Sequence, residues 1–353
     1  MGKLSHLMIT RWKLILNVAT IAALLITLYL VRHDLETTFQ NLTKVHAWIL
    51  IAIIPIEILN YHAQAKLYQH LFKNVGNELS YKYLYLASLE INFVNHVFPS
   101  GGAAGLSYFG LKIKNNEITG GKATLIQVLK LGMIFFSFEV LVILSVIALA
   151  LQGRVNSFTM LVAGILSTLL IVGSVLFVFI VGREERINYF LEFVTKQLNR
   201  FINHIRPRKY DIININRARK VFGDFHSSFR QIQNNRRQMR APFLYALLCN
   251  ITEVAVVYVV FLAFGRLVNV GAVILAYGVS NFAGMVSILP GGIGIYEALM
   301  TAVLVATGIP AAISLPVVIM YRVLNTLLQV PPGYYLYQKQ ISARAVTNNH
   351  GAA

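Results

Sequence analysis

The sequence contains a single cysteine, Cys249, among 353 residues. One thiol cannot form an internal disulfide framework or a cysteine-rich metal site, so we expect Cys249 to be a small apolar packing residue. Charged residues make up only 13% of the chain, and acidic residues number just 14. The sequence also shows no cluster of metal ligands, no nucleophile arrangement and no glycine-rich nucleotide loop. We therefore expect no metal and no cofactor.

Hydrophobic residues, by contrast, make up 56% of the chain, and the mean hydropathy is +0.62. Several apolar runs reach the roughly 20 residues that a helix needs to cross a bilayer. The first run, Trp12–Val31, lacks a small-residue cleavage site and is too long for a signal-peptide core, so we expect it to be retained. These features predict an all-α polytopic membrane protein that forms a single membrane domain over residues 1–353.

The apolar runs predict six full spans and two interrupted segments. The expected full spans are residues 12–31, 47–68, 122–150, 158–181, 241–264 and 310–337, followed by a polar and mobile tail from 338. In the interrupted segments, the second arms Ala103–Leu111 and Ile293–Ala306 reach only about 14 and 21 Å, against a hydrocarbon core of about 30 Å. Six spans plus two re-entrant helical hairpins are therefore expected, with eight shorter helices as the alternative.

The net charge of +17 is unevenly distributed along the chain. Of the 31 Lys and Arg residues, 25 lie in the two terminal segments and in the connections at 66–82, 112–122 and 182–240. The positive-inside rule predicts that both termini and these connections face the cytoplasm. The location of these basic residues suggests that they orient the protein in the membrane and contact anionic lipid headgroups. We therefore expect no nucleic-acid partner.

The longest polar segment, residues 182–240, carries 14 basic and 5 acidic residues. Within it, Ile187–Ile205 has apolar residues at helical spacing with polar residues between them. We predict an amphipathic helix at the cytoplasmic membrane surface. A helix packed on the rest of this loop is the alternative.

Two Pro-Gly breaks interrupt the apolar sequence. One reads LPGGIGIYE at residues 289–297, and the other reads FPSGG at residues 98–102. Proline ends a helix and glycine lets the chain reverse, but such a break is tolerated inside a membrane only where protein or a water-filled cavity covers the freed backbone groups. The breaks therefore favour hairpins that line a site, with a tight loop between two short spanning helices as the alternative.

The features around the two breaks predict an inverted repeat. In unit 47–150 Glu57 precedes the break and Lys130 follows it, while in unit 241–338 these places are taken by Glu253 and Arg322. Each carboxylate also has an asparagine three positions away, on the same helix face. By charge parity the two hairpins start from opposite sides of the membrane, as in many secondary transporters.

This layout predicts a site for an anion, most simply a lipid phosphate. Helix starts near Ala103 and Ile293 would point positive dipole ends into the membrane, and the two bases would add full charges. The predicted substrate-binding residues are Pro99, Gly101, Gly102, Pro290, Gly291, Gly292, Gly294, Glu297, Lys130, Arg322, Glu57 and Glu253. Alternatively, the carboxylates are only structural partners of the two bases.

The LPGGIG run followed by Glu297, the FPSGG run and the in-membrane Arg322 together resemble a known family over about residues 12–338. This is the transmembrane flippase-like domain of lysylphosphatidylglycerol synthases of the MprF type, with its stand-alone YbhN-like members. The resemblance implies a bacterial inner-membrane protein that moves or handles lipids. It also implies that aminoacyl transfer belongs to a separate cytosolic domain, which we do not expect in this chain.

The function that we expect is a flippase or transporter of an anionic phospholipid or lipid-linked headgroup. One alternative is a membrane enzyme acting on a lipid-linked phosphate or sugar, with Glu297 or Glu253 as acid or base. Another is an accessory subunit that recruits a lipid-modifying enzyme through the basic loop.

Overall fold

The computed structural model describes residues 45–98, 103–113, 118–151, 153, 157–183, 185–186, 236–286 and 292–350, with a few single residues between 29 and 41 and at 189 and 229. Every secondary-structure element in these ranges is a helix. Among them, five are long and apolar enough to cross a membrane. The protein is therefore an all-α polytopic membrane protein, as the sequence predicts.

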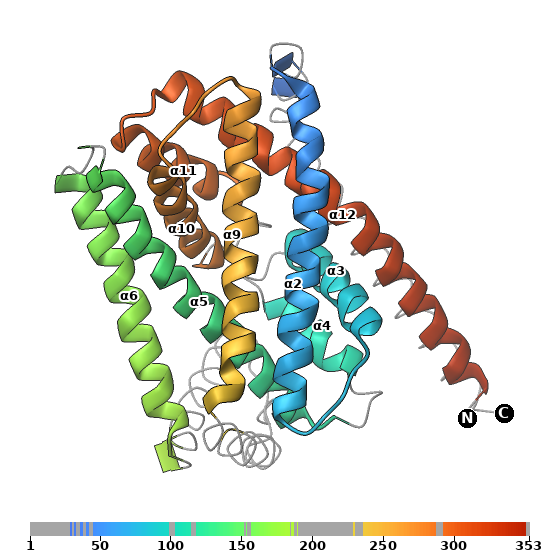
Figure 1. Ribbon diagram of the computed structural model, residues 1–353. Coiled ribbons are helices and arrows are strands. Elements are labelled where there is room, and N and C mark those ends of the chain that lie inside the picture. The colour runs from blue at the N-terminus through green and yellow to red at the C-terminus, as the bar shows by residue number, and fades with distance from the viewer. Residues whose placement is uncertain are drawn as a thin grey trace, which may run out of the picture.

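The five candidate spans coincide with five of the six predicted ones (Figure 1). They are η1 and α2 (Ala47–Ala52 and Ile53–Asn74), α5 (Gly120–Leu151), α6 (Ser157–Val181), α9 (Arg240–Ala263, after the short η3, Arg236–Met239) and α12 (Ala311–His350). The predicted span 12–31 and nearly all of the predicted amphipathic helix lie outside the described residues. One boundary is wrong: the expected mobile tail from 338 is instead the last part of α12, which continues to His350.

The two interrupted segments each form a pair of short helices. The first pair is α3 (Tyr81–Val97) and α4 (Ala103–Ile113), and the second is α10 (Val270–Val286) and α11 (Ile295–Ala306). The longest arms have 17 residues, or about 26 Å, which is less than the hydrocarbon thickness. Figure 1 shows the first pair in the lower half of the molecule and the second in the upper half.

Helices α2 and α9 lie side by side at the centre and make the most extensive helix–helix contact. Around them, the first arm of each hairpin packs on the last helix of the other half: α3 on α12, and α10 on α5. Glycines permit close approach in both places, because a Cβ at Gly333 would meet α3 at Leu89 and Phe93, and one at Gly278 would meet Phe138 of α5. Residues 47–150 and 241–338 thus pack on one another through these two helix pairs.

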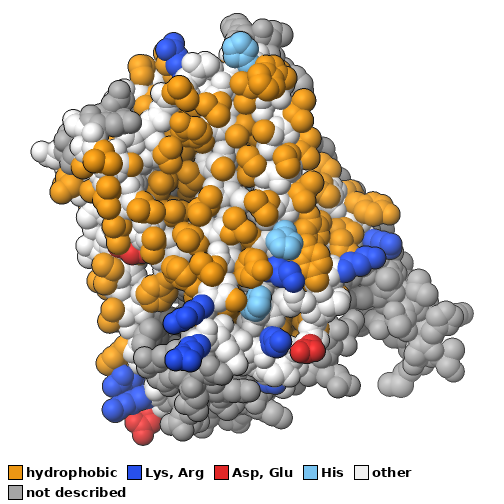
Figure 2. All heavy atoms as spheres, viewed as in Figure 1, with side chains coloured by type: hydrophobic (Ala, Val, Ile, Leu, Met, Phe, Trp, Pro, Cys, Tyr) orange, Lys and Arg blue, Asp and Glu red, His pale blue; other side chains and the backbone are white. Residues whose placement is uncertain are grey.

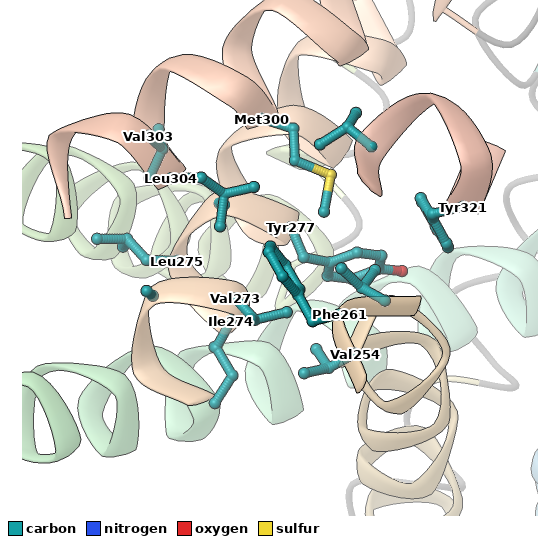
Figure 3. Packing of buried hydrophobic residues seen from close by; sticks show 14 of the residues in the cluster. Val254, Phe261, Val273, Ile274, Leu275, Tyr277, Met300, Val303, Leu304 and Tyr321 are labelled. Atoms are coloured by element: carbon teal, nitrogen blue, oxygen red, sulfur yellow. The ribbon is translucent and has the colours of Figure 1, made fainter. Parts of the chain in front are cut away.

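The apolar core is largest around the second hairpin (Figure 3). Side chains from α9, α10 and α11 meet there, and Tyr321 of α12 closes one side. The labelled members on the first three helices are Val254, Phe261, Val273, Ile274, Leu275, Tyr277, Met300, Val303 and Leu304. This packing fixes the position of the hairpin relative to α12.

The outer surface is as apolar as a lipid-facing surface requires. Helix α6 exposes an apolar stripe at helical spacing, formed by Leu161, Ile165, Leu169, Val172 and Leu176. Figure 2 shows hydrophobic side chains over most of one face, with Lys and Arg gathered mainly toward its lower end. At that end α2 stops and α9 starts, and Asn74 donates a hydrogen bond to the Gln238 carbonyl at 3.2 Å. The described ends of the basic connections 66–82 and 182–240 therefore meet at one end of the molecule.

Candidate functional site

A polar cavity of about 280 Å³ lies among α2, α3, α5, α9, α10, α11 and α12. Its lining lies well inside the long helices: Asn250 is the eleventh of 24 residues in α9, and Arg322 is the twelfth of 40 in α12. Six asparagines line it, namely Asn60, Asn92, Asn95, Asn250, Asn281 and Asn325. Polar groups are rare at this depth in a membrane protein and mark substrate or ion pathways.

Both in-membrane bases predicted from the sequence, Lys130 and Arg322, line this cavity. The Lys130 ammonium donates to Gln64 Oε1 at 3.3 Å and to Tyr68 Oη at 3.1 Å, and it lies 4.4 Å from the centre of the Tyr68 ring. No carboxylate forms an ion pair with Lys130 in the described part of the chain. The cavity therefore contains a cation whose observed partners are neutral.

Arg322 is held differently, because its Nε donates to Glu297 Oε1 at 2.9 Å. The other carboxylate oxygen, Glu297 Oε2, accepts from the backbone N–H of Gly294 at 2.6 Å. Glu297 thus links the first turn of α11 to α12, and its negative charge lies at a helix N-terminus, where the dipole favours it. The sequence predicted that an anion would be favoured here, and the anion observed is the chain's own carboxylate.

The hairpin backbone explains why glycine occupies two positions near this contact. Gly292 and Gly294 have φ angles of 71° and 86°, a region that other residues rarely adopt. A Cβ on Gly292 would also lie 2.9 Å from the Cα of Gly284 in α10. Pro290 and Gly291, like Pro99, Gly101 and Gly102 of the first break, lie outside the described residues.

The two predicted carboxylates occupy different places. Glu253 lines the cavity, whereas Glu57 is buried behind it and accepts a hydrogen bond from Gln329, a lining residue, at 3.3 Å. Neither forms an ion pair with Lys130 or Arg322 within the described ranges. Of the three carboxylates predicted for the site, Glu57, Glu253 and Glu297, the described part of the structure therefore pairs only Glu297 with a base.

The two predicted asparagines make contacts between helices. Asn60 of α2 donates to the Cys249 carbonyl and to Thr252 of α9, and Asn250 of α9 donates to the Ile134 carbonyl and to Ser137 of α5. These amide groups satisfy polar atoms across the interfaces, which is how polar side chains join helices in a membrane. Asn60 and Asn250 thus hold the walls of the cavity together.

Sequence reasoning missed most of the neutral polar lining. Asn325 and Gln329 lie four and eight residues after Tyr321, so all three share one face of α12. Asn60 and Gln64 have the same spacing in α2 and are joined by a hydrogen bond of 2.7 Å. Polar residues at intervals of four within an apolar span were the signal that could have located the cavity wall.

A second missed feature is a buried ion pair between Lys112 and Glu90. The charge pattern predicted Lys112 in a polar connection, but Lys112 is the second-last residue of α4 and is buried. Tyr108 of α4 also donates to Glu90, and both Tyr108 and Lys112 donate to Gln340 of α12. This cluster attaches the first hairpin to the last helix.

The fold and the site together define a class of protein. It is an all-helical membrane protein with a polar, partly cationic cavity inside its long helices. The chain belongs to the family described as the lysylphosphatidylglycerol synthase TM region, whose model matches residues 14–333. This confirms the resemblance seen in the two break motifs and Arg322, and it identifies a lipid-related membrane protein.

Individual relatives are archaeal membrane proteins described as UPF0104. One from Methanocaldococcus jannaschii is 22% identical over 333 residues, which is 92% of this chain and 94% of the relative. One from Methanothermobacter thermautotrophicus is 23% identical over 240 residues, covering 66% and 68% of the two chains. A protein from Pyrococcus horikoshii is 26% identical over 131 residues, and this match covers 36% of the chain and only 39% of the relative.

Proposed function

We propose that this protein moves an anionic phospholipid, or the anionic headgroup of a lipid-linked molecule, across the cytoplasmic membrane, and that it is not itself an enzyme. The observation that carries the proposal is Lys130, a mid-span cation in the cavity with only neutral partners among the described residues. An unpaired charge at this depth costs about 2.5–3.5 kcal/mol on insertion scales, so a bound anion would relieve a substantial cost.

The rest of the cavity supports a headgroup as the anion. Asparagine amides and Arg322 supply further hydrogen-bond donors, which suit the oxygens of a phosphate. The apolar exterior would leave the acyl chains in the bilayer while the headgroup passes through the polar interior. A cavity of about 280 Å³ is large enough for several heavy atoms of a headgroup.

We further propose that units 47–150 and 241–338 form an inverted repeat that alternates the side on which the cavity opens. Support comes from the order of helix, hairpin and helix in both units, and from the matching contacts of α3 with α12 and α10 with α5. Rocking of one unit against the other around a central site is how many such repeats work.

The transport proposal is tested by reconstituting the purified chain into vesicles that contain acyl-labelled fluorescent phosphatidylglycerol. An impermeant reductant bleaches only the outer leaflet, so we expect the protein to make the inner-leaflet label accessible over time. Labelled phosphatidylcholine should move more slowly, because it has no net negative charge. Movement of neither lipid would contradict the function, and equal movement of both would contradict the anion selectivity. Chemical conversion of the lipid would instead indicate the enzyme alternative.

The orientation that we propose places the basic end of the molecule in the cytoplasm. Single cysteines at Glu78→Cys, in the connection between α2 and α3, and Leu267→Cys, at the other end, provide matched reporters in a Cys249→Ser background. In intact cells an impermeant thiol reagent should label Leu267→Cys and should label Glu78→Cys only after lysis. The reverse pattern would invert the whole topology.

A further inference from the structure

Three side chains on one face of α12 connect two carboxyl groups within the membrane interior. Gln329 donates its Nε2 to Glu57 Oε2 at 3.3 Å and to Asn325 Oδ1 at 2.6 Å. Asn325 in turn contacts the hydroxyl of Tyr321 at 3.5 Å, and that hydroxyl donates to Glu253 Oε2 at 3.4 Å. Glu57 of α2 and Glu253 of α9 are thus joined by a continuous chain of hydrogen bonds.

The Glu57 end of this chain contains two oxygen atoms that lack a donor. Glu57 is 5% exposed and Gln329 is 2% exposed. Glu57 Oε1 and Gln329 Oε1 are both buried and have no hydrogen-bond partner in the described part of the molecule. A buried acceptor without a donor costs free energy. Because Glu57 and Gln329 already share a hydrogen bond, one cause should account for both unpaired oxygens.

A single proton would satisfy both of these atoms. A carboxylic acid and a primary amide can form a cyclic pair, in which the amide N–H donates to one carboxyl oxygen and the acid O–H donates to the amide oxygen. The first of these bonds is the one from Gln329 to Glu57, and the two atoms without partners are those that would form the second. One contact and the two atoms without partners are therefore what an acid–amide pair with its proton on Glu57 would require.

The electrostatic surroundings favour the same protonation state. Burial disfavours an ionised carboxylate, and the described residues provide no ion-pair partner for Glu57. A metal cation would need several oxygen ligands, whereas an amide N–H already occupies Glu57 Oε2.

We propose that Glu57 and Gln329 form a proton-binding site, and that its occupancy is coupled to anion binding in the cavity. The coupling rests on the proposed lipid transport, but the proton site itself does not. A carboxylate that takes up one proton from water becomes neutral and no longer repels a nearby headgroup. Anion and proton therefore favour one another, and this coupling is reciprocal. Tyr321, Asn325 and Gln329 line the cavity, so they connect the two sites directly.

The other ionisable groups around the pair come from every surrounding helix. The charged ones, with the histidine, are Glu253 on α9, Lys130 on α5, Arg322 on α12, Glu297 on α11 and His96 on α3. The phenols and the thiol, which remain neutral near pH 7, are Tyr61, Tyr85, Tyr277, Tyr296, Tyr321 and Cys249. Arg322 and Glu297 neutralise each other, which leaves Lys130 as the cation and Glu253 as the carboxyl group that an incoming anion meets.

Infrared spectroscopy of the reconstituted protein tests the proton site without any transport measurement. At neutral pH we expect the carbonyl band of a protonated carboxylic acid, and we expect Glu57→Gln to remove the part of it that Glu57 contributes. The matched control is Glu297→Gln, which should leave that band unchanged because Glu297 is paired with Arg322. Gln329→Leu should shift the band toward that of a free acid, which provides a second variant if Glu57→Gln does not fold. An identical band in the parent and in folded Glu57→Gln would overturn the site.

Vesicle transport under an imposed pH gradient then tests the coupling. Lipid movement should follow the pH gradient in the parent and become independent of it in Glu57→Gln. Movement that follows a sodium gradient instead, or that ignores the pH gradient in the parent, would overturn the coupling. If the acid band is present but no lipid moves under any gradient, the proposed transport is wrong and the proton site stands.

Discussion

Replacing Lys130 with methionine is expected to reduce transport of anionic lipid by roughly 10- to 100-fold. Hydrogen bonds to charged groups are each worth about 1.5–3 kcal/mol, and the headgroup would lose such a contact with the cavity wall. The folded protein should not be destabilised to a matching extent, because Lys130 has only neutral observed partners, Gln64 and Tyr68. Initial rates in the phosphatidylglycerol vesicle assay, alongside thermal unfolding in detergent, provide the two measurements.

A matched control exists on the same helix. Lys122, eight residues earlier on α5, donates to Asn77 at 3.0 Å at the basic end of the molecule. The Lys122→Met variant removes the same charge from α5 but leaves the cavity intact, so its transport rate should remain near that of the parent. Equal losses in the two variants would show that net positive charge matters and that the position of Lys130 in the cavity does not.

Replacing Arg322 with glutamine is expected to destabilise the protein by roughly 3–5 kcal/mol, the usual cost of removing one partner from a buried ion pair. The side chains of Arg322 and Glu297 are only 15% and 11% exposed, so solvent offers little compensation to the carboxylate left behind. Glu297 also holds the first turn of α11 through Gly294, so the second hairpin should loosen as well. Thermal unfolding of the purified variant measures the effect.

Two further variants separate the structural role of Arg322 from a role in lipid binding. The double variant Arg322→Gln with Glu297→Gln removes both charges and should recover most of the lost stability. Arg322→Lys keeps a charge near Glu297 but loses the planar fork that suits a phosphate. If anionic lipid raises the unfolding temperature of Arg322→Lys as much as that of the parent, Arg322 acts only through Glu297.

The sequence determined the class and the order of helices in this protein. Long apolar runs can be satisfied in a bilayer only as helices, so five described spans lie where hydropathy predicts them. The Pro-Gly breaks likewise predicted where α3 and α10 end and where α4 and α11 begin, because proline and glycine act on the local backbone alone. The extent of α12 beyond residue 338 was missed, since Gln340 is held by Tyr108 and Lys112 from a distant helix.

Only the tertiary structure decided which charges are paired. Lys130 and Arg322 occupy corresponding places after the two breaks, yet Arg322 has Glu297 as a partner whereas Lys130 faces Gln64 and Tyr68. Spacing along one helix reports which side chains share a face, but the partner of a charge depends on which face of another helix is turned toward it. The contact between Glu57 and Gln329 joins residues 272 positions apart on α2 and α12, so it exists only in the folded structure. The sequence thus determined which charged and polar groups lie in the spans, and the packing of the helices determined which of them contact one another.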